Sequence, residues 1–375
     1  MSPKYPGKST VINGNGAVAA VMNQVCGGVI GYPITPSTEI SETFQAALAQ
    51  GKLNVWGKTP FFFEPEGEHS AQSGAMGAAL TGGKYISNAS SSQGVLYALE
   101  SHYVTVGKRA GGFVLQVASR VVSRHSLNVM GGHDDVYSLL PAGYTIFFGA
   151  TPEEAADLAL ISFRTSALSL IPVANCMDGF STSHMLSEAR LPEDDLVREY
   201  LGDPTCRIKC PTVAQEILYG DAQGMRQLVP SLVDTDNPGM SGAVQNQPDF
   251  QSGVADSRTH FAADVPRLAR RAMDEYNALT GREYAPVRTF MCEDAEVILV
   301  GLGSITQDVQ AVLPHLRRQG IKVGLVQILQ LAPFPEADFV RAIGEVRHIA
   351  VLERSDMAAL TDLVNVALWK AAQNQ

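Results

Sequence analysis

The sequence lacks three features that would assign it to a large class of protein. Lys and Arg number 28 against 38 Asp and Glu, a formal net charge of −10, so the clustered positive charge of a nucleic-acid-binding protein is missing and no such partner is expected. No apolar run approaches the roughly 18–20 residues of a membrane-spanning helix, so no membrane partner is expected either. Residues 1–9 carry two lysines but no hydrophobic core, unlike a secretory signal. These absences predict a cytoplasmic protein.

Cysteine is also scarce. Five scattered cysteines are a poor basis for a disulfide framework. Cys206 and Cys210 stand close together, but no second pair or flanking histidine completes a tetrahedral metal site. The cysteine spacing of ferredoxin-type iron–sulfur proteins is missing as well. We therefore expect neither metal ligands nor an iron–sulfur cluster in this chain.

The 375 residues are too many for one average domain, and a hydrophobic share of 45% suits a globular protein with a large core. Over the first 185 residues a strand–turn–helix pattern repeats several times, which indicates an open parallel α/β sheet. The pattern fades from about residue 191 to residue 248, and a second α/β unit follows. We predict a first domain at 1–250, including a long connection from about 191, and a smaller second domain at 251–375.

One stretch carries an unusual density of carboxylates. The apolar run Phe61–Phe63 is followed by Glu64, Glu66 and Glu68, and then by a small-residue segment typical of a tightly packed helix. A strand that stops, turns and enters a helix places Glu68 at the helix N-terminus, where the helix dipole favours negative charge. A carboxylate half-buried there against the phenylalanines could exchange a proton with a bound ligand. Glu68 is therefore our candidate catalytic residue.

Two other positions suit the binding of an anion. In Tyr32-Pro33-Ile34-Thr35-Pro36 the two prolines hold the backbone extended ahead of a helix capped by Ser37 or Thr38. This loop either presents the Thr35 hydroxyl and backbone amides to an anion or is a stiff connection without a ligand. Arg120 follows the strand at 113–117, on the side of a parallel sheet where ligands bind. It either grips a carboxylate with two parallel hydrogen bonds or forms a surface ion pair.

Other motifs are better explained by structure than by ligand binding. Gly14 to Ala19 formally fits a dinucleotide-binding pattern, but a capped helix start is the better interpretation. The glycine-rich turn at 301–304 lacks the acidic residue that would accompany a dinucleotide site. His125 and the run His133-Asp134-Asp135 have no further ligand at metal-binding spacing, so a loop tied down by hydrogen bonds is favoured.

Taken together, these motifs resemble the α subunit, or first two domains, of the 2-oxoacid:ferredoxin oxidoreductases, such as pyruvate:ferredoxin oxidoreductase. The resemblance extends from Asn13 to about Ser355. The segments that carry it are Tyr32 to Pro36, Glu64 to His69, Ser92-Gln93-Gly94, Arg120 to Asp135, Asp178 to His184 and Gly301 to Pro335. It implies a parallel-sheet domain that binds the pyrimidine side of thiamine diphosphate, followed by a smaller transketolase-C-terminal-like α/β domain.

The resemblance also implies roles for single residues. Glu68 would hydrogen-bond the pyrimidine ring nitrogen and so activate the cofactor, while Tyr32, Pro33 and Ile34 would line the thiamine ring. Thr35 and Arg120 would bind the carboxylate of the 2-oxoacid. The chain lacks the Gly-Asp-Gly signature for the diphosphate and Mg²⁺.

The resemblance places the missing groups on partner chains. A β subunit would hold the diphosphate and Mg²⁺, and γ and ferredoxin-like δ subunits would complete the hetero-oligomer and carry the clusters. Coenzyme A would take the acyl group, and electrons would pass to ferredoxin. Pyruvate is the favoured substrate; an aryl or branched 2-oxoacid such as phenylglyoxylate, with NAD reduced through a flavin subunit, stays open. Two other functions also stay open: a non-redox thiamine-dependent lyase and a non-catalytic scaffold.

Overall fold

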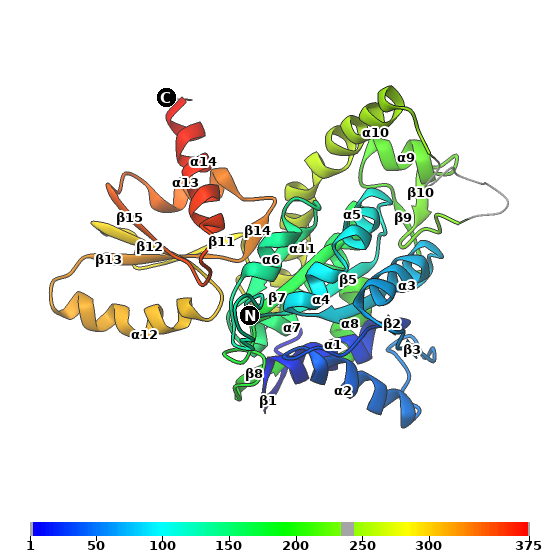
Figure 1. The fold of residues 1–375 in the computed structure, drawn as a ribbon, viewed down its shortest axis with the longest axis horizontal. Coiled ribbons are helices and arrows are strands. Elements are labelled where there is room, and N and C mark those ends of the chain that lie inside the picture. The colour runs from blue at the N-terminus through cyan, green and yellow to red at the C-terminus, as the bar shows by residue number, and fades with distance from the viewer. Residues whose placement is uncertain (1–2, 234–243, 374–375) are drawn as a thin grey trace.

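The computed structural model describes residues 3–233 and 244–373. Figure 1 shows two α/β units side by side, the larger one built mainly from the first half of the chain. The larger unit contains a seven-stranded sheet with the strand order β14-β6-β7-β5-β4-β2-β3. Its strands are β2 (Gly28–Ile30), β3 (Phe61–Phe63), β4 (Ile86–Ser90), β5 (Phe113–Ser119), β6 (Thr145–Gly149), β7 (Val173–Asp178) and β14 (Gln330–Ala332).

The strand order reverses direction near one edge of this sheet. Strands β2 to β7 pair in parallel, and only β14 is antiparallel. The chain passes outward from β2 to β3 and then returns to β4 on the other side of β2. Ligands of open α/β sheets bind at such a reversal, outside the carboxyl ends of the strands. The loops that follow β2, β3, β4 and β5 therefore lie where a ligand of such a sheet is expected.

Helices cover both faces of the sheet. Along β5, Val114 belongs to one hydrophobic core, while its neighbours Phe113 and Leu115 belong to the other, as the two-residue period of a strand requires. The first core receives α1 (Gly14–Val25), α2 (Thr38–Ala49), α7 (Pro152–Ser169) and α11 (Val265–Thr280). The second receives α3 (Glu68–Leu80), α4 (Ser92–Tyr97) and α6 (Asp134–Leu139); α5 (Leu99–Gly107) packs against α3.

The connection that begins near residue 191 contains more regular structure than its composition indicates. It follows β8 (Ser187–Leu191), which pairs with β1 (Lys8–Ile12), and contains α8 (Asp194–Leu201), β9 (Arg207–Lys209), α9 (Val213–Tyr219), β10 (Met225–Gln227) and the start of α10 (Gln247–His260). Residues 234–243 of the predicted connection lie outside the described residues. The short 3₁₀ turn at Ala262–Asp264 joins α10 to α11.

The second unit has a four-stranded sheet in the order β11-β13-β12-β15. It comprises β11 (Val287–Phe290), β12 (Val297–Leu302), α12 (Ile305–Arg318), β13 (Val323–Ile328), α13 (Glu336–Ile343), β15 (His348–Leu352) and α14 (Ala359–Gln373). Its apolar residues Val300 and Val326 belong to the second core of the first unit, so the two units share one hydrophobic interior. Among the described residues, no helix combines the length and apolar character needed to cross a membrane.

Most predicted elements are present, and two of them differ in their limits. The apolar run from Leu168 to Asn175 predicts a strand, but the strand begins only at Val173, because α7 continues to Ser169. The sequence predicts a helix over Val95 to Thr105, but the helix begins at Ser92 and breaks at Ala98. The predicted domain boundary at residue 250 stays a prediction, although α11, which lies beyond it, packs against α7 of the first unit.

Candidate active site

Glu68 is the first residue of α3, directly after the turn that follows β3. The helix begins there because Gly67 adopts an extended backbone and its carbonyl accepts the amide of Ala71 at 2.9 Å. Glu68 is half-buried, while Phe61 and Phe63, against which the sequence pattern placed it, are 37% and 57% exposed. Strand β3 is the outermost strand of the sheet, which leaves these side chains uncovered. The Glu68 side chain instead lies over the loop after β4.

The contact partner of the Glu68 side chain is a glycine. A Cβ on Gly94 would lie 2.9 Å from Glu68 Cγ, 2.9 Å from Glu68 Oε1 and 2.7 Å from Ser90 Oγ. All three distances are shorter than real Cβ contacts, so only glycine leaves room for the carboxylate at this point of α4. Ser90 is 3% exposed, and its hydroxyl has no hydrogen-bond partner among the described residues. The carboxylate and a buried polar atom with unused hydrogen-bonding capacity thus lie close to the same point beside Gly94.

Arg120 lies at the carboxyl end of β5 and is 5% exposed. Its Nη1 donates to the Thr35 carbonyl oxygen at 2.9 Å, and its Nε donates to the Asn128 carbonyl oxygen at 3.0 Å. Its Nη2 has no partner among the described residues. Burial lowers the pKa of Arg120, and the Asp135 carboxylate opposes this effect. The structure therefore brings Arg120 to the Thr35 loop and leaves part of the guanidinium available to an anion.

The Thr35 loop, residues 32–37, lies beside Arg120. The Thr35 side chain is exposed, while Tyr32, Pro33 and Ile34 are half-buried. The predicted helix start is confirmed, since α2 begins at Thr38, but Ser37 does not cap it; the Ser37 hydroxyl donates back to the Ile34 carbonyl oxygen at 2.8 Å. This bond closes the turn, so the loop keeps its shape without support from the helix end.

Asp135 connects these loops and is the functional residue whose role the sequence did not reveal. Its buried carboxylate accepts hydrogen bonds from the backbone amides of Ser92 (2.7 Å) and Arg120 (2.9 Å) and from the Ser119 hydroxyl (2.8 Å). Burial raises the pKa of Asp135 to about 6, against the effect of these donors. Contacts thus run without interruption from Glu68 through Gly94 and α4 to Asp135, Arg120 and the Thr35 loop.

The histidine-containing loop is tied down by hydrogen bonds, as expected. His133 Nε2 lies 2.9 Å from Asp178 Oδ1, and both residues are buried. Asp178 also accepts the backbone amide of Ser304 at 2.5 Å, which places a carboxylate of the first unit at the start of α12 in the second. Attraction to His133 and Arg354 and the bond from Ser304 lower the pKa of Asp178 despite its burial. The described residues contain no group of three side chains that could hold a metal ion.

Both glycine motifs have structural roles. The Asn13 side chain accepts the Gly16 amide at 2.7 Å and so caps α1, as the favoured interpretation required. Gly303 has a φ of +71° and lies against the Asp178 carboxylate, so the turn before α12 is shaped around an internal anion.

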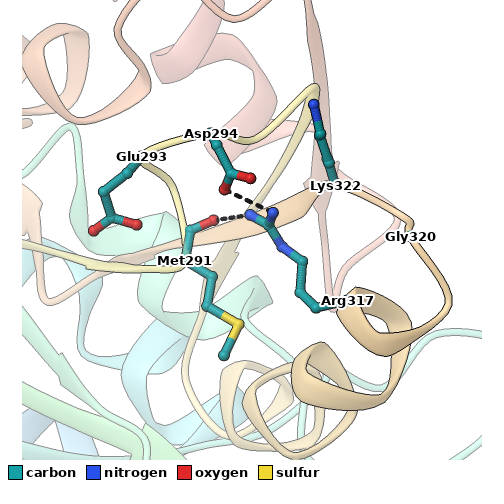
Figure 2. A pocket seen from close by; sticks show the side chains of 6 residues that line it. All are labelled: Met291, Glu293, Asp294, Arg317, Gly320 and Lys322. Atoms are coloured by element: carbon teal, nitrogen blue, oxygen red, sulfur yellow. Dashed lines mark hydrogen bonds and ion pairs between the residues drawn. The ribbon is translucent and has the colours of Figure 1, made fainter.

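A hollow of about 460 Å³ on the second unit is not part of this site (Figure 2). Its Arg317 donates to Asp294 at 2.7 Å and to the Met291 carbonyl oxygen, so the cation is already satisfied. It also lies away from the carboxyl ends of the first sheet, where the predicted site residues gather.

The family of the chain follows from comparison with known proteins. Residues 19–247 match the model described as "Pyruvate flavodoxin/ferredoxin oxidoreductase, thiamine diP-bdg". The chain belongs to this oxidoreductase family. Residues 295–371 match pyruvate:ferredoxin oxidoreductase core domain II. The predicted family and fold class, a thiamine-diphosphate-binding parallel-sheet domain followed by a smaller α/β domain, are confirmed.

Several curated relatives are pyruvate-flavodoxin oxidoreductases. The probable enzyme of Escherichia coli K12 is 33% identical over 347 residues, which are 92% of this chain and 28% of the relative. That of Nostoc sp. (strain ATCC 29151 / PCC 7119) is 30% identical over 345 residues, 92% of this chain and 80% of the relative. The chain thus spans little more than a quarter of the E. coli protein.

Solved structures share the fold at low sequence identity. The 2-oxoglutarate:ferredoxin oxidoreductase from Magnetococcus marinus superposes with a TM-score of 0.67 at 15% identity, over 96% of this chain and 61% of that one. A split-gene transketolase, an inactive β4 tetramer, gives a TM-score of 0.50 at 12% identity, over 96% of this chain and 86% of that one.

Proposed function

We propose that the chain is the α-subunit part of a 2-oxoacid oxidoreductase that decarboxylates its substrate oxidatively and transfers the acyl group to coenzyme A. One observation carries the proposal: the Glu68 carboxylate is held against Gly94 at a helix start, and contacts through Asp135 connect it to Arg120. A general base and a cation for a carboxylate are the two groups that such a reaction requires of this half of the site.

The residues around Gly94 would suit the aminopyrimidine of thiamine diphosphate. Gly94 lets the Glu68 carboxylate lie close to α4, and the buried Ser90 hydroxyl beside it has no partner among the described residues. The side-chain oxygen of Asn88 is likewise buried and unpaired, 3.3 Å from the position that a Cβ on Gly31 would take. A ring that carries both donor and acceptor nitrogens would satisfy such atoms, which are costly when left unpaired.

Glu68 has the central role in this mechanism. Its Oε1 would hold the proton that is shared with the pyrimidine ring nitrogen. When bound, thiamine diphosphate supplies the nucleophilic carbon that attacks the keto group and retains the electron pair when carbon dioxide leaves. Tyr32, Pro33 and Ile34 would line the thiamine ring and keep water from it.

Arg120 and Thr35 would orient the substrate. The free Nη2 of Arg120 suits one oxygen of the 2-oxoacid carboxylate, and the exposed Thr35 hydroxyl can donate to the second. Pyruvate is the proposed substrate, in keeping with the relatives. These residues recognise only the carboxylate and keto group, which all 2-oxoacids share.

The remaining groups would come from partner chains. A β subunit would hold the diphosphate and Mg²⁺, while γ and ferredoxin-like δ subunits would complete the complex and carry the iron–sulfur clusters. Electrons would leave one at a time through these clusters to ferredoxin. The match of this chain to only 28% of the E. coli relative supports a division of labour among several chains or domains.

The test is anaerobic reduction of the purified native complex by a panel of 2-oxoacids with coenzyme A, followed as bleaching of the clusters. Glu68→Gln should slow bleaching by about 10²- to 10⁴-fold, the usual contribution of a positioned general acid–base group. Arg120→Ala should raise the KM for the oxoacid. Glu64→Gln, which alters an exposed carboxylate in the same turn, is the matched control and should leave the rate unchanged.

The outcomes separate the parts of the proposal. Bleaching by one oxoacid identifies the substrate. Bleaching of Glu68→Gln at the parent rate, with the cofactor bound, would show that the central residue is wrongly assigned. Release of carbon dioxide without bleaching would favour a non-redox lyase.

A further inference from the structure

The loop that follows Arg120 is held by two neighbouring aspartates that face different parts of the molecule. Asp135 fixes the Arg120 amide to the loop after β4 of the same unit. Asp134 accepts the amide of Val122 at 3.2 Å through one oxygen and the hydroxyl of Ser355 through the other. A single carboxylate therefore joins the backbone two residues beyond Arg120 to the second unit.

Ser355 belongs to a segment of four residues, 353–356, which follows β15 and contacts the first unit at every position. The Tyr137 hydroxyl donates to Glu353 at 3.0 Å, and the His133 amide donates to the Arg354 carbonyl oxygen at 3.0 Å. Asp356 forms an ion pair with Arg124. All of these partners lie between residues 122 and 137, so the contacts gather on the loop that carries Arg120 and on the start of α6.

The Arg354 side chain joins the two units by contacting Asp178 of the first and Ser304 of the second. Its Nη1 lies 3.4 Å from Asp178 Oδ1 and donates to the Ser304 hydroxyl at 3.1 Å. Asp178 is fully buried and also accepts from the Ser304 amide. Because a buried carboxylate is costly unless its partners stay in place, the second unit is held in one position relative to the His133 side of the loop.

We infer that the 353–356 segment is a positioning element for Arg120, through which the second domain takes part in binding the oxoacid. The inference rests on the proposed role of Arg120. Through the hydrogen bonds that join Ser355 to Asp134 and Asp134 to Val122, the segment holds the loop in position at the end of β5. The Nε of Arg120 depends on the same loop, because it donates to the Asn128 carbonyl oxygen.

The experiment compares Ser355→Ala and Arg354→Met with the parent complex. Arg120 holds the substrate carboxylate before and during the reaction, so its displacement should raise the KM for the oxoacid and leave kcat unchanged. We expect an increase of about 3- to 30-fold, the usual range for a residue that acts through another. Lys322→Met removes an exposed ion pair elsewhere in the second domain and is the matched control, with no expected change in KM.

A second readout does not depend on activity. Amide hydrogen exchange over residues 121–132 should become faster in both variants and stay unchanged over α3. An unaltered KM together with unaltered exchange in both variants would overturn the inference, as would a fall in kcat at constant KM. If no oxoacid reduces the parent complex, the proposed function fails, and the exchange comparison still decides whether the segment holds the loop.

Discussion

Replacement of Gly94 by alanine should separate catalysis from folding. The new methyl group would lie 2.7 Å from the Ser90 hydroxyl oxygen and 2.9 Å from Glu68 Oε1. The backbone can accept alanine, because Gly94 lies inside α4 and is not among the positive-φ glycines. Alanine favours a helix by about 0.5–1 kcal/mol over glycine, which offsets part of the ~1–3 kcal/mol that overpacking costs. We therefore expect a folded protein of similar stability.

The effect on catalysis should be much larger. The Glu68 carboxylate is the mobile end of a side chain, so it is the group that moves away from the methyl. A displacement of about 1 Å at a reacting group costs about 100-fold in rate. The assay is the initial rate of cluster bleaching under saturating oxoacid and coenzyme A, with thermal unfolding measured on the same preparation.

Gly77→Ala is the matched control, because Gly77 lies in the same helix as Glu68 and a Cβ there meets nothing within 4 Å. This change should stabilise the protein by about 0.5–1 kcal/mol and leave the rate unchanged. If Gly94→Ala bleaches its clusters as fast as Gly77→Ala, the Glu68 carboxylate does not act from the position described, and the reasoning is refuted.

Two further predictions concern buried ionisable groups. Burial lowers the pKa of His102 to about 3, so below pH of about 6.5 only the unfolded chain takes up this proton, and the folded protein loses stability as the pH is lowered. Between about pH 7.5 and pH 5, the free energy of unfolding in urea should decrease by about 2 kcal/mol more in the parent than in His102→Gln. An equal loss in both proteins would contradict this. Arg282 Nε lies 3.0 Å from the fully buried Asp157, so Arg282→Met should lower the free energy of unfolding by about 3–5 kcal/mol. Arg317→Met, whose partner Asp294 is exposed, should cost clearly less; equal costs would show that burial does not matter here.

Local signals in the sequence were sufficient to place the elements around the site. The turn from Phe63 to Glu68 was predictable because an apolar strand, a proline, a glycine and a small-residue helix follow one another within a few residues. In the second unit, the sequence pattern predicts a helix from Glu336 to Ile343, the same limits that the structure shows. Such features depend on neighbours in the chain, which a sequence displays directly.

Contacts between distant segments could not be predicted in this way. The run His133-Asp134-Asp135 indicated a hydrogen-bonded loop but not that Asp135 would join the loops after β4 and β5. The apolar character of Phe61 and Phe63 pointed to burial, but an edge strand leaves both exposed. These outcomes depend on strand order, and strand order depends on pairings that no local pattern encodes.

Strand β14 has a consequence for how the protein comes into being. It lies beyond β13 in the chain, yet it pairs with β6 and covers what would otherwise be a bare edge of the first sheet. During synthesis, β1 to β13 therefore leave the ribosome before β14 can complete the first sheet. The domains of a chain usually fold in the order of their synthesis. Here the sheet of the first domain is complete only when β14 has been synthesised together with the second domain. The two halves of the molecule thus mature together.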